Sequence, residues 1–549
     1  MTTFQESLRD HLLSGYQMLL VQTHEERRCL VEINNLIRTT KSSLKEFNVF
    51  VWDFADGLVG VTDSVSHRAT TGAPENQGPD AILQYLLKLL TSGVSEPMKH
   101  IYVLQDMHKF TNDPEVCRLI RHIFHWKLCS SNNPDVKLIF LQPPGEVPND
   151  LKHCLTEIEF GLPDDKDLAD VLDFVLDSYF GNKENKPDNE ELKSSCVIAG
   201  RGLTANEFED ACSLALTRSR GKLEDAPKTI EHQKKQILKT TSSLTYISPD
   251  EIESMDSFAG WDGFIEFMER QAVAFSKAGR DAGLEPPRGV GLIGVPGTGK
   301  SVAGKAAARL LSEKAKRPMP LVILDVGAMF NSLVGKTEEN VRMTLKTVDA
   351  LGGCALFIDE IDKAFSGMSS SSTDSGVSQR VFGSILTWLT SKKSDTFVIV
   401  TMNRIENLPP ELLRKGRFDE IFAVELPDFE TRKKIFEIHF RKRGVDPTKV
   451  ATTSQWNTLA EKSSKFVGSE IEEAVRTAIN QAFYARQDKT PTYAELFDAV
   501  AGTRSLYSLN PESITKMEEY AKTKARSVKT KMEMHTPTVK TSRRISSTN

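Results

Sequence analysis

The sequence lacks the features that mark membrane-spanning and disulfide-stabilised proteins. It contains no run of about 18 apolar residues, the length that a helix needs to cross a bilayer. The first residues, MTTFQESLRDHLLSGYQ, interrupt their apolar positions with Glu6, Arg9 and Asp10, unlike a secretory signal peptide. The seven cysteines form no C-x-x-C pair, so neither a zinc site nor a disulfide framework is indicated. We therefore expect a cytoplasmic protein with no membrane partner, whose cysteines fill the core.

An excess of positive charge is also missing. The formal net charge is −5 and the sequence pI is near 6.2, so no domain-wide basic face is indicated and a nucleic-acid partner is not expected. Hydrophobic residues make up 39% of the chain and charged residues 26%, as in ordinary globular proteins. A chain of 549 residues is too long for one core and should fold as several lobes.

Two successive halves of the chain show the same order of predicted elements. In each half, apolar strand-like runs alternate with helical sequence, which predicts an α/β domain with a parallel sheet, and a helical segment follows. A polar, charged stretch separates the halves and is the best linker candidate, with a connecting helix over IEHQKKQIL as the alternative. The predicted domains are a degenerate α/β domain at 1–165, its helical lobe at 166–220, a linker at 221–250, a large α/β domain at 251–428, a helical lid at 429–505 and a C-terminal extension at 506–549.

The stretch GVGLIGVPGTGKSVAG, residues 289–304, matches the phosphate-loop pattern. Its glycines let successive backbone N–H groups point at an anion, and the start of the following helix adds its positive end. Lys300 is placed to reach the β- and γ-phosphates and Ser301 to bind Mg²⁺. The loop therefore predicts a bound nucleoside triphosphate with Mg²⁺. The predicted contacts are Gly294, Val295, Pro296, Gly297, Thr298, Gly299, Lys300, Ser301 and Val302.

Three further segments place polar residues at or beyond the ends of predicted strands. Asp359 and Glu360 follow a buried strand, where the first is suited to hold hydrated Mg²⁺ and the second to orient the attacking water. Asn403 ends the strand TFVIVTMN and can donate to the γ-phosphate or to the water; a turn-starting asparagine is the alternative. Arg414 and Arg417, in LLRKGRFDEIF, are cations suited to transition-state charge. Their place along the sheet suggests that they serve a neighbouring subunit.

The first half has lost the corresponding nucleotide motifs. Its first strand is followed by QTHEERR, which has neither glycine nor lysine at the needed spacing. Its strand YVLQD ends in Asp106, Met107 comes next, and no catalytic glutamate follows. We interpret this half as a degenerate copy of the second, lacking a nucleotide site; an unrelated α/β domain is the alternative.

Together, the phosphate loop, the strand ending in Asp359 and Glu360, Asn403 and LRKGRFDE resemble, in this order, the AAA clade of the AAA+ ATPases. The resemblance covers about residues 250–500. It implies a large α/β subdomain, a small helical lid, and Mg·ATP bound between the subunits of a homo-oligomeric ring that is usually hexameric. The glycine-led lid motif of the family matches FVGSEIEEAVRTA, which implies that Gly468 and Ser469 face the nucleotide, with no arginine there.

A closer resemblance extends over nearly the whole chain. LVQTHEERR, GRGLTANEFEDACSLAL and LDVGAMFNSLVGKTEENVR are similar to the plastid and cyanobacterial AAA proteins called hypothetical chloroplast frame forty-six, which also carry a degenerate N-terminal half. Many AAA translocases have an aromatic residue in the first pore loop, where this chain has Leu333, Val334 and Gly335. A leucine offers a threaded chain less contact area and no ring face. The flexible composition of Ser366–Gly376 fits a second pore-facing segment.

The C-terminal extension is rich in Lys, Arg, Ser and Thr from about Lys522 to Asn549, which predicts a solvated, unstructured tail; contact with nucleic acid or phosphate is the alternative. For the whole chain we expect an ATPase that remodels or unfolds a protein substrate. The alternatives are an ATP-dependent switch or scaffold that recruits partners through the first half, and a nucleic-acid motor.

Overall fold

The structure, a computed structural model, describes residues 3–39, 43–61, 67–68, 78–91, 99–129, 135–145, 147–181, 187, 189–241, 243–326, 337–365, 375–392, 394–404, 414 and 416–530. The chain divides into two compact units, Met1–Ile230 and Glu231–Asn549, which are described separately. Within the described residues, every helix is too short or too polar to cross a lipid bilayer. Six of the seven cysteines lie in the described core as free, buried thiols, which confirms their expected role there.

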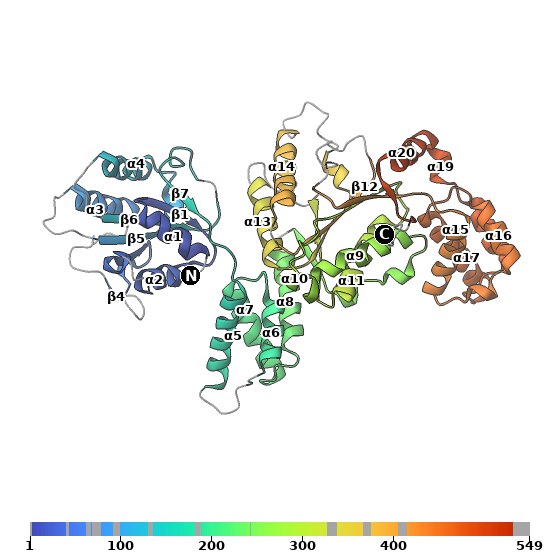
Figure 1. The fold of residues 1–549 in the computed structure, drawn as a ribbon, viewed down its shortest axis with the longest axis horizontal. Coiled ribbons are helices and arrows are strands. Elements are labelled where there is room, and N and C mark those ends of the chain that lie inside the picture. Colours follow the sequence, from blue (N-terminus) through green and yellow to red (C-terminus); the bar gives the residue numbers. More distant parts are fainter. Residues whose placement is uncertain are drawn as a thin grey trace, which may run out of the picture. The chain divides into compact units, whose positions relative to one another are not determined.

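The first unit is a seven-stranded sheet between two helical layers (Figure 1). Its strands are β1 (Met18–Gln22), β2 (Asn48–Asp53), β3 (Gly57–Gly60), β4 (His67–Arg68), β5 (Lys99–Gln105), β6 (Asp135–Gln142) and β7 (Thr156–Ile158). Helices α1 (Thr3–Leu13) and α2 (Glu26–Thr39) pack on one face, and α3 (Pro79–Thr91) and α4 (Pro114–Cys129) on the other. The short 3₁₀ helices are η1 (Ser43–Glu46) and η2 (Met107–Phe110). A helical lobe follows, with α5 (Asp165–Phe180), α6 (Glu190–Gly200) and α7 (Ala205–Ser219).

The second unit repeats this architecture and adds a four-helix lid. Its strands are β8 (Leu244–Ile247), β9 (Gly289–Gly294), β10 (Leu321–Leu324), β11 (Ala355–Ile358), β12 (Phe397–Met402), β13 (Glu420–Val424) and β14 (Arg526–Ser527). Helices α9 (Asp262–Phe275) and α11 (Lys300–Ala315) cover one face, while α13 (Thr337–Ala350), α14 (Ser375–Ser391) and α20 (Pro511–Lys524) cover the other. The lid contains α15 (Phe429–Lys442), α16 (Thr453–Lys462), α17 (Gly468–Arg486) and α18 (Tyr493–Gly502).

The remaining elements are short or lie at boundaries. They are α8 (Ala226–Thr241), which contains the division between the units, α10 (Lys277–Asp281), α19 (Leu506–Leu509), η3 (Pro249–Glu251), η4 (Met255–Ser257), η5 (Ile361–Phe365) and η7 (Pro447–Lys449). The central strands β9, β11 and β12 are buried along their whole length, as parallel strands covered on both faces must be. Their apolar runs place the polar residues that follow them at one edge of the sheet.

The parallel strands of the two sheets follow the same order. In the first unit it is β7-β1-β6-β5-β2, and in the second it is β13-β9-β12-β11-β10. Numbered along the chain, both read 5-1-4-3-2. The shared order confirms the repeat of architecture that the sequence predicts. The edge strands differ, and the second sheet alone ends in a strand from the C-terminal segment, β14, paired with β13.

Two stretches that we expected to be linker or unstructured are folded. The expected linker at 221–250 forms α8 and then β8, which pairs antiparallel with β10 because Leu244 and Tyr246 alternate into the core. The prediction that the C-terminal extension is unstructured is wrong for residues 506–530, which form α19, α20 and β14. Ile514 and Val528 are buried there, and these apolar contacts fix a segment whose composition is otherwise polar. Residues 531–549 lie outside the described part of the chain.

Candidate nucleotide-binding site

The loop between β9 and α11 curls around its own lysine. Nζ of Lys300 donates hydrogen bonds of 2.8 Å to the carbonyl oxygens of Gly294 and Val295. The side chain is buried, which lowers the pKa of Lys300 to about 8 against the opposing effect of nearby carboxylates. Within the described residues, the hydrogen bonds of this buried ammonium go to neutral carbonyls, which compensate its charge poorly, so this position favours an incoming anion.

Gly297 brings the loop into contact with the lid. Its φ of 81° lies in the left-handed region, and a Cβ there would lie 2.3 Å from Oγ of Ser469. The N–H of Ser469 donates to the carbonyl oxygen of Gly297 at 3.0 Å. Gly468 and Ser469, at the start of α17, therefore lie directly against the phosphate loop and line the same cavity.

Ser301 and Asp359 meet at the carboxyl edge of the sheet. The Ser301 hydroxyl donates to Oδ1 of Asp359 at 2.7 Å. Thr401, on β12, donates to the same oxygen at 2.5 Å and accepts the backbone N–H of Glu360 at 2.8 Å. A hydroxyl and a carboxylate side by side are oxygen ligands that suit Mg²⁺ held together with phosphates, so the residues present fit this ion. Sequence reasoning missed Thr401, whose signal is a hydroxyl inside the apolar strand that precedes Asn403.

Glu360 is held in place from two sides. Nδ2 of Asn403 donates to Oε1 of Glu360 at 2.7 Å, and Lys363 forms an ion pair with the same carboxylate. The hydrogen bond from Lys363, opposed by burial and supported by Asn403, lowers the pKa of Glu360. Asp362, which sequence reasoning also missed, is buried and accepts the N–H groups of Asn403 and Arg404 at 2.9 and 3.1 Å. Asn403 does not end the strand as expected, because β12 ends at Met402, but it is a fixed part of this cluster just beyond the strand.

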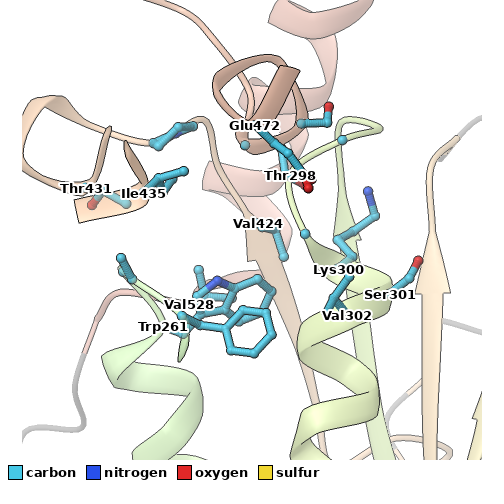
Figure 2. Close-up of a pocket in the computed structure, with 18 of the residues that line it drawn as sticks. Trp261, Thr298, Lys300, Ser301, Val302, Val424, Thr431, Ile435, Glu472 and Val528 are labelled. Atoms are coloured by element: carbon cyan, nitrogen blue, oxygen red, sulfur yellow. The ribbon is translucent and has the colours of Figure 1, made fainter. Parts of the chain in front are cut away.

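A cavity of about 460 Å³ opens beside these groups. One end is lined by the phosphate loop together with Glu360 and Asn403. The other end is lined by residues 257–261, which precede α9, and by residues of the lid and the C-terminal segment, including Ile435 and Val528. Figure 2 shows Lys300 and Ser301 on one side of the pocket and Trp261 and Ile435 on the other. The cavity therefore joins a polar, anion-accepting end to a mainly apolar end, as a nucleotide requires.

The two arginines of the LRKGRFDE segment do not join this cluster. Among the described residues that line the cavity, neither Arg414 nor Arg417 occurs. Arg414 is exposed, and Nη1 of Arg417 is buried without a hydrogen-bond partner among the described residues. The turn itself is fixed, because the carboxylate of Asp419 accepts the N–H groups of Arg288 and Gly289 at 2.7 and 2.8 Å. Leu333, Val334, Gly335 and residues 366–374, the expected pore-facing segments, lie outside the described residues.

In the first unit, a buried carboxylate of the chain bonds to the start of α7. Glu25 follows β1 and is only 4% exposed. Its Oε1 accepts the N–H of Ala205, at the start of α7, at 2.7 Å, and its Oε2 pairs with Arg28 at 2.7 Å. The start of α7 thus bonds to Glu25, whereas the start of α17 in the second unit faces an open cavity. The segment after β1, which has no phosphate-loop pattern, is thus tied to α7 by a side-chain carboxylate.

Our prediction of where β5 ends, and of the acidic residue there, was wrong by one residue. We expected the strand to end in Asp106 with no glutamate following, but β5 ends at Gln105. Asp106 stands immediately before η2 with φ of 53°, just as Glu360 stands before η5 with φ of 48°. By backbone position, Asp106 therefore corresponds to Glu360, and Gln105 takes the place of Asp359. The amide of Gln105 bonds to Glu26 at 3.0 Å, so the metal-side carboxylate is the one that has been lost.

Comparison with known proteins agrees with this division. Residues 290–426 match the family described as ATPase family associated with various cellular activities (AAA), and residues 4–160 match the family described as SpoVK-like AAA ATPase, N-terminal domain. An AAA domain-containing protein ycf46 from Gracilaria tenuistipitata var. liui is 32% identical over 88% of this chain and 92% of its own length. The chain belongs to the ycf46 AAA proteins. The ycf46 protein of Guillardia theta is 29% identical over 94% of this chain and 95% of its own length.

The chain is also similar to AAA ATPases other than the ycf46 proteins. A 26S proteasome regulatory subunit 4 homolog from Oryza sativa subsp. japonica is 32% identical over 36% of this chain and 45% of its own length. The chain is thus an AAA ATPase with an AAA-like N-terminal domain. The N-terminal match also settles the alternative of an unrelated α/β domain in favour of an AAA-like one.

Proposed function

We propose that this protein hydrolyses ATP with Mg²⁺ in the cavity of its second unit, and that a ring of its subunits, a hexamer, uses the turnover to remodel or unfold a protein substrate. The observation that carries the proposal is the cluster of Ser301, Asp359, Glu360 and Asn403 beside Lys300 at one end of the cavity. Phosphoryl transfer needs positioning and charge neutralisation more than covalent chemistry, and this cluster can supply both.

Each side chain has a separate task in this proposal. Lys300 leaves the loop carbonyls to bond the β- and γ-phosphates, while Ser301 and Asp359 hold the metal. Bound Mg²⁺ would neutralise the charge that develops on the phosphate oxygens. Glu360 orients and polarises the attacking water, and Asn403 fixes that carboxylate through its amide and also contacts the γ-phosphate or the water.

The ring is proposed from the arginines. Arg414 and Arg417 are absent from the described lining of their own cavity, and Nη1 of Arg417 is buried with no hydrogen-bond partner among the described residues. A cation supplied from a neighbouring subunit is a known device for stabilising the transition state of phosphoryl transfer. We propose that both arginines act on the site of the next subunit, so that hydrolysis requires assembly.

The proposal of a protein substrate has indirect support. It is supported by the relative named as a regulatory subunit of the proteasome and by the resemblance to AAA translocases. A second candidate, an ATP-dependent switch or scaffold, is favoured by the first unit, which has an AAA-like fold without the phosphate-loop sequence and could therefore serve to recruit partners. In both cases we propose a cytoplasmic location and neither nucleic-acid nor membrane partners.

Stimulation of ATP hydrolysis separates these functions. A permanently unfolded polypeptide should accelerate hydrolysis by the full chain, whereas DNA and RNA should not. Leu333→Ala should keep basal hydrolysis and folding but lose the stimulation, because a leucine that faces a channel contributes little to stability, whereas truncating a core leucine costs about 2–5 kcal/mol. A large loss of stability in Leu333→Ala would assign that residue to the core. If unfolded polypeptide does not accelerate ATP hydrolysis by the wild type, the result would favour the ATP-dependent switch or scaffold.

A further inference from the structure

The C-terminal segment of the described chain is bound to the second unit on two sides. β14 extends the sheet in parallel register beside β13, with Arg526 opposite Phe422. The N–H of Val528 donates to the carbonyl of Ala423 at 3.2 Å. In the other direction, the carbonyl of Val528 accepts the N–H of Phe264, in the first turn of α9, at 3.0 Å. A strand of two residues is therefore held both by the sheet and by the otherwise unsatisfied start of a helix.

Residues far from this segment in the sequence allow it to dock. Gly263, in the first turn of α9, packs so closely against the segment that a Cβ would lie 2.3 Å from the carbonyl oxygen of Thr530. Real side chains do not make such a contact, so glycine is required there for the segment to dock. The guanidinium of Arg526 lies over the ring of Phe422 at 5.6 Å and donates to the carbonyl of Thr530 at 3.0 Å. These contacts make residues 526–530 part of the folded unit.

The same segment lines the cavity. Val528, which is 2% exposed, and Lys529 both lie on its wall, at the end that also includes Trp261. In Figure 2, Val528 and Trp261 lie on the side of the pocket away from Lys300. Because the phosphates must lie at the glycine-rich loop, the base and ribose extend toward this end. Val528 and Lys529 are therefore in position to contact them.

Lys529 joins this wall to the lid. Its Nζ pairs with Oδ2 of Asp428 at 2.8 Å, and Asp428 caps α15 by accepting the N–H of Thr431 at 2.9 Å. Although burial opposes the shift, the bonds from Lys529 and Thr431 lower the pKa of Asp428 to about 2. Thr431 and Ile435, on α15, line the cavity as well. The ion pair thus ties the C-terminal segment to the lid helix that faces the same ligand.

We propose that residues 526–530 form the wall of the nucleotide pocket that receives the base and ribose, with Val528 and Lys529 as nucleotide-contacting residues, so that nucleotide binding and docking of the C-terminal segment stabilise each other. This proposal rests on ATP binding by the second unit. It makes the pocket dependent on a segment more than 200 residues beyond the phosphate loop, since Lys529 and Lys300 are far apart in the chain. Within the described residues of the first unit, no strand corresponds to β14.

Two truncated chains test the proposal. A chain that ends at Thr530 keeps the segment and should bind a fluorescent ATP analogue with Mg²⁺ as the full chain does. A chain that ends at Ala525 loses the segment and should bind about tenfold more weakly or worse, since it loses both Val528 and Lys529. Lys529→Ala in the full chain should weaken binding in the same direction by a smaller factor. Equal affinities of all these chains would overturn the proposal.

Hydrogen exchange on the intact chain covers the case in which the shorter chain does not fold. Because coupling between two binding events is reciprocal, saturating Mg·ATP should slow exchange of the Val528 amide by about the same tenfold factor. The amides of β8, at the opposite edge of the same sheet, serve as the internal control and should change much less. Equal effects at both edges, or none at Val528 while ATP is bound, would refute the coupling. A full chain that fails to bind ATP would instead refute the proposed function and this inference together.

Discussion

Asn403 and Glu360 are joined by a hydrogen bond of 2.7 Å between Nδ2 and Oε1, although 43 positions separate them in the sequence. The bond links the ends of β11 and β12, which are neighbours in the sheet. Glu360 has φ of 48°, a conformation that residues other than glycine rarely adopt, and such backbone is kept only where surrounding contacts impose it. The surrounding structure therefore imposes the geometry of this pair. Substitutions of Glu360 and of Asn403 should have different effects on hydrolysis.

Glu360→Gln should bind Mg·ATP normally but hydrolyse it at least about 100-fold more slowly. The amide keeps an oxygen for Asn403 to bond, so the cavity stays intact while the charge that polarises the water is lost. Bound ATP should persist, and the protein should accumulate in its assembled form. Glu313→Gln, on the exposed side of α11, is the matched control and should hydrolyse ATP like the wild type. Hydrolysis by Glu360→Gln within a few-fold of wild type would remove Glu360 from this role.

Asn403→Asp should shift the pH dependence of hydrolysis. A second carboxylate beside Glu360 replaces a hydrogen-bond donor with a like charge, and both changes raise the pKa of Glu360. Since the ionised carboxylate is the active form, the acid limb of the pH–rate profile should move to higher pH. Asn403→Ala removes the hydrogen bond without adding charge and should give a smaller shift with a lower plateau. Identical acid limbs in wild type and Asn403→Asp would show that Glu360 does not control this limb.

The affinity for Mg·ATP should fall as the pH rises through about 8, the pKa of Lys300 in the free protein. Phosphates raise that pKa, so above about pH 8 the complex holds one more proton than the free protein, and the Kd should rise by up to about tenfold per pH unit. Titrations between about pH 7 and about pH 9 measure this. In Lys300→Arg the guanidinium stays protonated throughout, so any remaining affinity should be independent of pH. A wild-type Kd as flat as that of the variant would contradict the lowered pKa.

The sequence was most informative where chemistry depends on short spacing. The phosphate loop and the Asp359–Glu360 pair could be placed from local patterns, because each lies between a buried strand and a helix. Thr401 and Asp362 could not be placed, since their roles arise only when β11 and β12 lie side by side. The C-terminal strand was missed for the same reason: two residues carry no periodicity, and their conformation is set by pairing with β13.

The first unit shows a different limit to what can be predicted from sequence. The loss of its glycine loop was visible in the sequence, but the bond between Glu25 and the start of α7 was not. Glu25 and Ala205 are 180 residues apart, and nothing in QTHEERR indicates that one of its two glutamates bonds to the start of a distant helix. Likewise, the strand was expected to end at Asp106 but ends at Gln105, because the left-handed conformation of Asp106 is a backbone property rather than a residue type.

Arg417→Ala should bind ATP but hydrolyse very little alone, because the arginine is absent from the described lining of its own cavity. Lys300→Ala should also be inactive, through loss of binding. Mixed in equal amounts, the two variants should recover hydrolysis, since a Lys300→Ala subunit still offers its Arg417 to an intact pocket of Arg417→Ala. Mixing Arg417→Ala with Arg417→Lys is the control and should recover much less. Activity per subunit that is unchanged in verified monomers would show that the arginine does not act between subunits.

The central claim is that one half of the chain binds ATP and the other half does not. Counting bound nucleotide by equilibrium dialysis tests it most directly, with the Glu360→Gln chain used so that ATP is not consumed. At saturating Mg·ATP we expect one nucleotide for each chain, and none when Lys300→Ala is added to the same chain. Two nucleotides for each chain, or one that persists without Lys300, would contradict the account.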